Sequence, residues 1–161
     1  MNKSDPFRPA DDEARALALK LLGEAHHGAL ATLEPQTGSP MVTRIAVTQG
    51  PGGDPHALIS TLAAHTTALL ADPRCSLLVG EPGKGDPLAH PRLTLFCRAQ
   101  PLPREGSDFP AAMEAMLAAN PKVRLYAGFA DFTLFRLRVE RASLNGGFGR
   151  AWRLDRRDIL S

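Results

Sequence analysis

Four side chains near the middle of this sequence could together bind a phosphate group. Arg44 stands among apolar residues, and Ser60, Thr61 and Thr66 come just before or at the start of a short segment that reads as a helix. A phosphate dianion is bound well by a fork-shaped guanidinium, by hydroxyls and by free backbone N–H groups at a helix N-terminus. These residues can supply all three. The alternative for Arg44 is an ordinary charge on the solvent side of a strand.

Four other polar residues have both a chemical and a structural interpretation. His65 adjoins Thr66 and is either functional or a surface histidine at a helix start. Asp131 precedes a strongly apolar segment, where a carboxylate either ends a turn or joins a polar network. The adjacent pair His26-His27 points in two directions and has no carboxylate or cysteine partner at ligand spacing, so no metal site is expected.

The segment from Gly146 to Trp152 holds three glycines around Phe148. Glycine permits close backbone approach to a flat ligand or a neighbouring chain, and Arg150 could pair there with a carboxylate or phosphate. The alternative is a glycine-rich bend that packs Trp152 on the body of the protein. A second glycine pair, around Lys84, lacks the spacing and the Ser/Thr of a phosphate-binding loop.

The hydrophobic pattern predicts the elements that position these residues. An amphipathic helix is expected over about 11–25, with acidic residues at its start. Short strands are expected at 29–33, 41–48, 56–61, 74–80, 92–99, 132–139 and 142–145, and helices at 66–71, 108–120 and 123–126. The short turns between the first strands exclude a doubly wound parallel sheet. Six or seven antiparallel strands with peripheral helices indicate a mainly β, α+β barrel.

Composition limits the organisation and the class of the protein. The 161 residues suit one domain over 11–161, preceded by a flexible arm at 1–10. A net charge of +2 and 6% aromatic residues argue against nucleic-acid binding. No apolar stretch approaches the roughly 20 residues that cross a bilayer, and the polar N-terminus is not a secretory signal. We therefore expect a cytoplasmic protein in which Cys75 and Cys97 are buried thiols.

Five sequence strings, in order, resemble the pyridoxamine 5'-phosphate oxidase-like FMN-binding split barrels, and within them the haem-utilisation branch. The first three are GALATL at 28–33, LISTLAAHT at 58–66 and PRLTL at 91–95. The other two are ADFTLFRL at 130–137 and GGFGRAW at 146–152. No string is specific alone, but five with plausible spacing over nearly the whole chain form a strong signal.

The resemblance implies a homodimer with FMN between its subunits, and it assigns candidate binding residues. The phosphate is expected on the second and third strands and the following turn, and Phe148 and Arg150 are candidates for the flavin edge and for an anionic group. The expected cofactor-binding residues are Thr43, Arg44, Ile45, Ser60, Thr61, His65, Thr66, Phe148 and Arg150. In place of the strongly basic pair of many relatives the chain has His65-Thr66, which weakens phosphate binding.

The resemblance favours an FMN-dependent oxidoreductase with an unknown small substrate, in which the flavin performs the redox chemistry. Haem binding or degradation is an alternative, with Asp131 at a position where haem-degrading relatives carry an aspartate. The histidine that these relatives use beyond the glycine-rich string is absent, because no histidine follows His90. A non-catalytic flavin-binding protein is a further alternative. Pyridoxamine phosphate oxidation itself is not expected.

Overall fold

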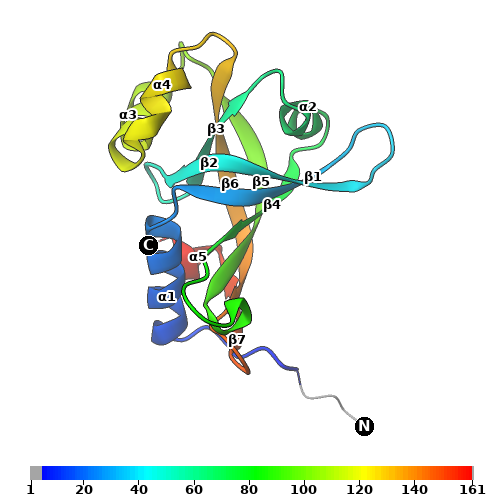
Figure 1. Ribbon diagram of the computed structural model, residues 1–161, viewed down its shortest axis with the longest axis vertical. Coiled ribbons are helices and arrows are strands. Elements are labelled where there is room, and N and C mark those ends of the chain that lie inside the picture. The colour runs from blue at the N-terminus through cyan, green and yellow to red at the C-terminus, as the bar shows by residue number, and fades with distance from the viewer. Residues whose placement is uncertain (1–4, 161) are drawn as a thin grey trace.

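A computed structural model of the chain describes residues 5–160 and shows a seven-stranded antiparallel sheet closed into a split barrel (Figure 1). The sheet order is β3-β2-β1-β4-β5-β6-β7, and an additional β3–β6 pairing closes the barrel. The strands are β1 (His27–Leu33), β2 (Pro40–Gln49), β3 (Pro55–Ser60), β4 (Arg74–Val79), β5 (Arg92–Leu102), β6 (Phe132–Asn145) and β7 (Ala151–Asp155). The expected mainly β split-barrel class with peripheral helices is confirmed.

The helices lie at the ends and on the outside of the barrel (Figure 1). They are α1 (Asp12–Gly23), α2 (Ala64–Ala71), α3 (Phe109–Ala119), α4 (Arg124–Ala127) and α5 (Arg156–Ile159), with short 3-10 turns η1 (Pro87–Ala89) and η2 (Pro121–Val123). No helix among residues 5–160 is long and apolar enough to cross a membrane.

Helix α1 forms where the sequence predicted it. The Asp11 side chain accepts a hydrogen bond from the Ala14 N–H at 2.8 Å, which satisfies one of the free donors of the first turn. One turn and two turns further on, Ala18 and Leu22 follow Ala14 on the same face, and all three are fully buried against the barrel core. A second apolar cluster lies outside the barrel, where α3 inserts Ala112 and Met116 against the sheet.

Strand β6 joins the parts of the sheet, and it corrects the prediction of two separate strands at 132–139 and 142–145. It is one strand that pairs with β5 along most of its length, with β3 through its first part and with β7 through its last. The β5 register moves from Phe96↔Arg141 to Cys97↔Val139, so Glu140 is an extra residue in a bulge. Because a bulge bends its strand, β6 can pair with both β3 and β7 along one edge.

The strand predicted at 142–145 does end at the glycine pair, but the prediction that it is the last strand is wrong, because β7 follows. The chain reverses through Gly146 and Gly147 and returns beside β6. Gly147 has φ +108, and an added Cβ would lie 2.7 Å from the Ala89 carbonyl oxygen, so only glycine fits there. The returning strand buries Trp152 completely, which confirms the interpretation of this segment as a bend that packs the tryptophan.

The described part of the expected N-terminal arm, residues 5–10, contacts β7. The Arg8 N–H donates to the Ala151 carbonyl at 2.8 Å, and Asp5 pairs with Arg153 at 2.6 Å. The first four residues of the arm lie outside the described residues.

Asp54, just before β3, bridges the gap that the split leaves on β6. Between the residues of β6 that pair with β3 and those that pair with β7, the Val139 N–H donates to Asp54 Oδ1 at 2.9 Å. Arg156 donates to the Val139 carbonyl at 2.6 Å and pairs with Asp54 at 2.8 Å, while Arg136 pairs with Asp54 at 2.6 Å. The carboxylate is fully buried. Burial alone would raise the pKa of Asp54, but the hydrogen bonds from Arg156, Val139 and Arg136 outweigh it and lower the pKa.

Replacing Asp54 with asparagine should lower the free energy of unfolding by about 3 kcal/mol, because both arginines would lose a buried counter-charge. A loss of about 3 kcal/mol is at the lower end of the range for removing one partner of a buried ion pair, because both arginines are partly exposed. Urea denaturation measures the effect. Glu140→Gln is the matched control: it removes a neighbouring but exposed ion pair with Arg98 and should cost under about 1 kcal/mol. Equal losses in the two variants would contradict the bridging role of Asp54.

Candidate functional site

Strand β2 divides the predicted site residues between its two faces. Successive side chains of a strand point to opposite sides. Ile45 is 5% exposed and belongs to the barrel core, whereas Arg44 is exposed on the outer face. Thr43 lies on the same face as Ile45, at the end of the barrel where α2 begins. The side chains of Arg44 and Thr43 therefore lie on opposite faces of the sheet. The Ile45 side chain is buried in the core and cannot contact a ligand on the surface.

Arg44 opens onto a groove of about 650 Å³ between the first two strands and the segment from α3 to α4. In the part of the chain that the structure describes, no carboxylate pairs with Arg44. Lys122 of η2 and Tyr126 of α4 line the same groove. Asn120 ties the two walls together by donating a hydrogen bond to the His26 carbonyl at 3.4 Å. The groove thus carries two cations that face one opening.

Sequence reasoning missed Lys122, Tyr126 and Asn120. They lie more than seventy residues after Arg44 in the chain, at the end of a helix whose position over β2 follows only from packing. The one available signal is that a helix ends just before Pro121 and that a basic and an aromatic residue follow closely. This pattern is too common to identify a site.

An aromatic pair continues the outer surface towards β3. The rings of Tyr126 and Phe132 have centroids 4.8 Å apart. Phe132 is the register partner of Ser60 in the β3–β6 ladder, so the ring and the hydroxyl side chain lie on one face of the sheet. The outer corner of β2 and β3 therefore combines a free guanidinium with a pair of aromatic rings whose planes are tilted by 45°.

In the turn from β3 to α2, the side-chain hydroxyls of Ser60 and Thr66 form hydrogen bonds with other groups of the protein. Ser60 Oγ donates to Asp131 Oδ2 at 3.0 Å and accepts from the Leu62 N–H at 3.1 Å. Thr66 Oγ1 donates to the Ser60 carbonyl oxygen at 2.5 Å and is buried. Asp131 is thus part of a polar network, and its backbone carbonyl also accepts from the Thr61 N–H at 2.6 Å. Ser60 and Thr66 thus stabilise the turn. Both hydroxyl protons are donated to protein acceptors and are not free for a ligand.

The same turn leaves other donors open. Helix α2 has no side-chain cap at Ala63. The N–H groups of Thr66 and Thr67 donate to the Ala63 carbonyl, whereas those of Ala64 and His65 have no acceptor among residues 5–160. Free N–H groups at a helix start favour an anion. The exposed Thr61 lies three residues before the first residue of this helix.

His65 is held by one of its two ring nitrogens. Nδ1 lies 3.0 Å from Thr43 Oγ1, which fixes the ring against the end of the barrel. Nε2 is buried and has no hydrogen-bond partner among the described residues. Burial lowers the pKa of His65, so the imidazole is neutral at pH 7. The structure thus joins two of the predicted residues, Thr43 and His65, in one contact.

Within one chain, Phe148 and Arg150 lie far from this region. They lie in the hairpin between β6 and β7, at the end of the molecule opposite α2 (Figure 1). Phe148 is 67% exposed. Arg150 pairs with Glu13 of α1 and lies over the Trp152 ring, 5.3 Å from its centroid.

No group of three or more His, Cys, Asp or Glu side chains within residues 5–160 is arranged to bind a metal ion. Cys75 and Cys97 are free, buried and opposite each other in the β4–β5 register. Burial raises the pKa of the Cys75 thiol to about 12. Both cysteines are therefore unreactive packing residues at neutral pH.

The chain is similar to known proteins over most of its length. The family model for pyridoxamine 5'-phosphate oxidase matches residues 11–146. The chloroplastic non-canonical heme oxygenase HOZ of Arabidopsis thaliana is 34% identical over 85 residues, which are 53% of this chain and 25% of that protein.

Two solved structures superpose closely. A heme binding protein from Mycobacterium smegmatis is 32% identical, with a TM-score of 0.82 over 95% of this chain and 61% of that one. A protein of unknown function from Agrobacterium tumefaciens is 32% identical, with a TM-score of 0.84 over 98% and 66% of the two chains. The chain spans only part of the length of HOZ and of both these structures.

The environment of His65 predicts its titration. The ring should lose its proton below the ordinary histidine pKa of about 6.5, because burial disfavours the charged form. An NMR titration of the His65 ring protons, assigned with the His65→Gln variant, measures the midpoint. A midpoint at or above the ordinary value would show that the ring is solvated and not held as described.

Proposed function

The chain belongs to the pyridoxamine 5'-phosphate oxidase family, and we propose that it is a flavoprotein that binds FMN at the outer corner of β2 and β3. In this proposal it acts as an oxidoreductase on a small substrate. The bound flavin would supply the hydride or electron transfer. The protein's own residues bind and orient the flavin.

The observation that carries the proposal is the unpaired guanidinium of Arg44 beside a second cation. An exposed arginine with no carboxylate partner retains its full capacity for a bidentate contact with phosphate. Lys122 lines the same groove and adds a positive charge that the sequence after β3 lacks. The free N–H groups at the start of α2 are a separate set of anion donors, on the side of β2 that Thr43 faces. These features fit a phosphate ester.

The flavin ring would require a flat apolar surface next to the phosphate. The tilted pair of Tyr126 and Phe132 offers aromatic surface on the same outer face, and either ring alone could supply the flat contact. The hydrogen bond between Ser60 and Asp131 lies beside Phe132 and fixes the two polar side chains next to the aromatic pair. In this arrangement Ser60 and Thr66 position the turn, and the direct phosphate contacts come from Arg44 and Lys122.

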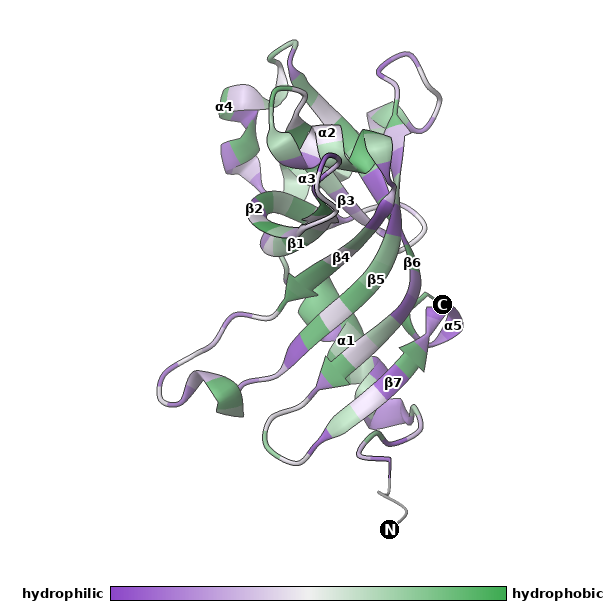
Figure 2. Ribbon diagram, turned by 90° about the vertical axis from the view of Figure 1, so that its right-hand side faces the viewer, coloured by the Kyte–Doolittle hydropathy of each residue, from purple (hydrophilic) through white to green (hydrophobic). Residues whose placement is uncertain are grey.

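A homodimer forms part of the proposal. The outer face of β4, β5, β6 and β7 has no helix in front of it, and α1 lies behind the sheet (Figure 2). Leu78 is 41% exposed on this face, and Thr94 and Ser143 follow it in register across β5 and β6. A second copy would cover such a surface under two-fold symmetry. Only a second copy could bring the exposed Phe148 and the neighbouring Arg150 to a shared cofactor.

Haem binding is a second candidate, favoured by one specific observation. His65 has a neutral ring whose Nδ1 is oriented by Thr43 and whose Nε2 has no partner among residues 5–160. An imidazole oriented through its other nitrogen is the usual form of a haem or metal ligand. The similarity to HOZ and to the M. smegmatis heme binding protein supports this candidate. It requires a shift of α2, because Nε2 is buried.

Replacing Arg44 with alanine should weaken FMN binding by about 1.5–3 kcal/mol, the contribution of a hydrogen bond to a charged group. Flavin fluorescence quenching during FMN titration measures the dissociation constant. Arg124→Ala is the control: Arg124 is exposed on α4, close in sequence to Tyr126, and does not line the groove. The control should bind FMN as the unchanged protein does.

Three results would contradict the FMN proposal. They are no binding at high FMN concentration, the same affinity in the Arg44→Ala variant, and an equal loss in the control. A parallel haem titration distinguishes the second candidate, since a Soret band that His65→Ala abolishes and Arg44→Ala leaves intact would assign the site to haem.

A further inference from the structure

Arg104 follows β5 in the loop that leads to α3, and its guanidinium binds the main chain of another segment. Nη2 donates to the carbonyl oxygens of Phe132 at 2.8 Å and of Phe129 at 2.9 Å, and a longer contact of 3.5 Å reaches the carbonyl of Ala127. The two short hydrogen bonds use both protons of this nitrogen. One side chain therefore ties the turn between α4 and β6 to the loop after β5.

The end of β5 explains why a side chain supplies these hydrogen bonds. The last register pair of β5 and β6 is Leu102 with Leu134. The next residue, Pro103, cannot continue the ladder because it has no N–H. Continuing the antiparallel count places Arg104 opposite Phe132, the first residue of β6. The Arg104 guanidinium thus supplies a donor for the Phe132 carbonyl at the point where the β5–β6 ladder ends.

The turn that Arg104 holds carries the aromatic pair of the proposed flavin site. Tyr126 lies before this turn and Phe132 directly after it, with ring centroids 4.8 Å apart. Within the turn, the Phe129 N–H donates to the Tyr126 carbonyl at 3.0 Å, and the Phe132 N–H donates to the Phe129 carbonyl at 3.1 Å. Because Arg104 binds the carbonyls of both Phe129 and Phe132, its contacts fix the two rings of the pair relative to each other.

The segment from α3 to β6 is tied to the rest of the protein at both ends. At the end of α3, Asn120 donates to the His26 carbonyl at 3.4 Å, across the Arg44 groove. Before β6, Arg104 holds the turn, and its guanidinium also lies over the Phe109 ring of α3, 5.6 Å from the centroid. The side chains of η2 and α4 that line the groove lie between these two ties.

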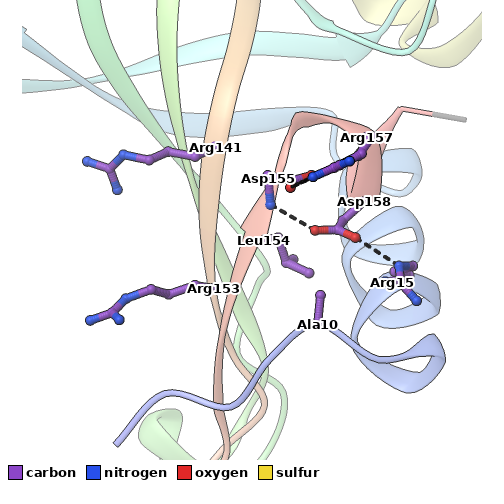
Figure 3. Close-up of a pocket in the computed structure, with 8 residues that line it drawn as sticks. All are labelled: Ala10, Arg15, Arg141, Arg153, Leu154, Asp155, Arg157 and Asp158. Atoms are coloured by element: carbon purple, nitrogen blue, oxygen red, sulfur yellow. Dashed lines mark hydrogen bonds and ion pairs between the residues drawn. The ribbon is translucent and has the colours of Figure 1, made fainter. Parts of the chain in front are cut away.

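Arginines at the other end of the molecule, around β7 and α5, have different partners. They line a groove of about 810 Å³ and pair with carboxylates (Figure 3). Arg15 pairs with Asp158 at 2.9 Å, and Arg157 pairs with Asp155 at 3.1 Å. Arg104 pairs with no carboxylate in the described range 5–160, and its short contacts go to main-chain carbonyls. Its contribution is therefore to the position of a backbone segment.

We propose that Arg104 is a positioning residue of the flavin site, which holds Tyr126 and Phe132 in the arrangement that receives the flavin ring. The role rests on the proposed function, because it requires a flavin to lie against the aromatic pair. Arg104 itself does not line the Arg44 groove and does not contact the phosphate. It acts on binding through the turn between α4 and β6.

The single tyrosine of the chain gives a direct test without any ligand. With ring-labelled tyrosine, an NMR spectrum contains the signals of Tyr126 alone, displaced from those of free tyrosine by the neighbouring Phe132 ring. Arg104→Ala should move these signals towards the positions of free tyrosine. The indole signal of Trp152, the single tryptophan, should stay unchanged, because Trp152 is buried in the barrel core and reports that the barrel is folded.

FMN titration of the same proteins measures the effect on binding. Arg104→Ala should weaken FMN binding by about tenfold, the effect of losing a hydrogen-bonded tie of this kind. Arg104→Lys keeps the charge but not the fork-shaped donor, so it should restore only part of the affinity and of the Tyr126 signal position. Arg124→Ala is the matched control: Arg124 is exposed on α4 and donates to none of the carbonyls that Arg104 holds, so both readouts should be unchanged.

Four results would overturn the positioning role. The first is an unmoved Tyr126 signal in Arg104→Ala, and the second is a loss of FMN affinity no larger than in Arg124→Ala. The third is a lower midpoint of thermal unfolding with both readouts unchanged, which would show a purely structural role. The fourth is full affinity in Arg104→Lys with a displaced Tyr126 signal, which would assign the effect to charge. If the unchanged chain binds no FMN, the proposed function fails and this role fails with it, whereas the four results above leave the proposed function standing.

Discussion

The split barrel depends on the contact of Asp54 and Arg156 with Val139. Strand β6 must pair with β3 at one end and with β7 at the other, and between them its edge has no neighbouring strand. A carboxylate oxygen takes the place of a backbone acceptor for the Val139 N–H, and a guanidinium takes the place of a donor for its carbonyl. Two side chains thus complete the hydrogen bonding that a missing strand would supply. The ion pair between them holds the start of β3 and the C-terminal helix α5 on β6.

This bridge adds to the β3–β6 pairing that closes the barrel. With β3 fixed on β6, the barrel closes, and its interior is filled by apolar side chains such as Leu30, Leu77 and Phe135. The Arg44 groove forms instead on the outer surface, beside the α3 to α4 segment. Its arginine stands on a strand that the barrel holds rigidly, which suits the binding of an anion.

The sequence predicted the strands and helices whose signals are local. The alternation in β1 and β2 and the acidic cap of α1 are properties of short windows, and the structure confirms them. The break expected near 140 was wrong, because one bulged residue, Glu140, looks like a strand end in the sequence. Strand β7 was missed because it is only five residues long and follows a glycine-rich bend.

The candidate site was predictable only in part, for a similar reason. Arg44 was identified because an arginine among apolar residues is conspicuous, but its neighbour Lys122 comes from a distant element. The hydrogen bonds of Ser60 and Thr66 could not be predicted, because the positions of their acceptors depend on how β3, α2 and β6 pack together. The position of Ile45 in the core follows from the face of β2 that the barrel encloses, which a single sequence leaves open.

The most direct test of the central claim is the stoichiometry of the reconstituted protein in solution. Light scattering gives the mass of the particle, and the flavin absorbance of the same sample gives the FMN bound per chain. The account predicts a particle of two chains that carries one FMN per chain. A particle of one chain that still binds FMN, or a two-chain particle that binds none, would contradict it.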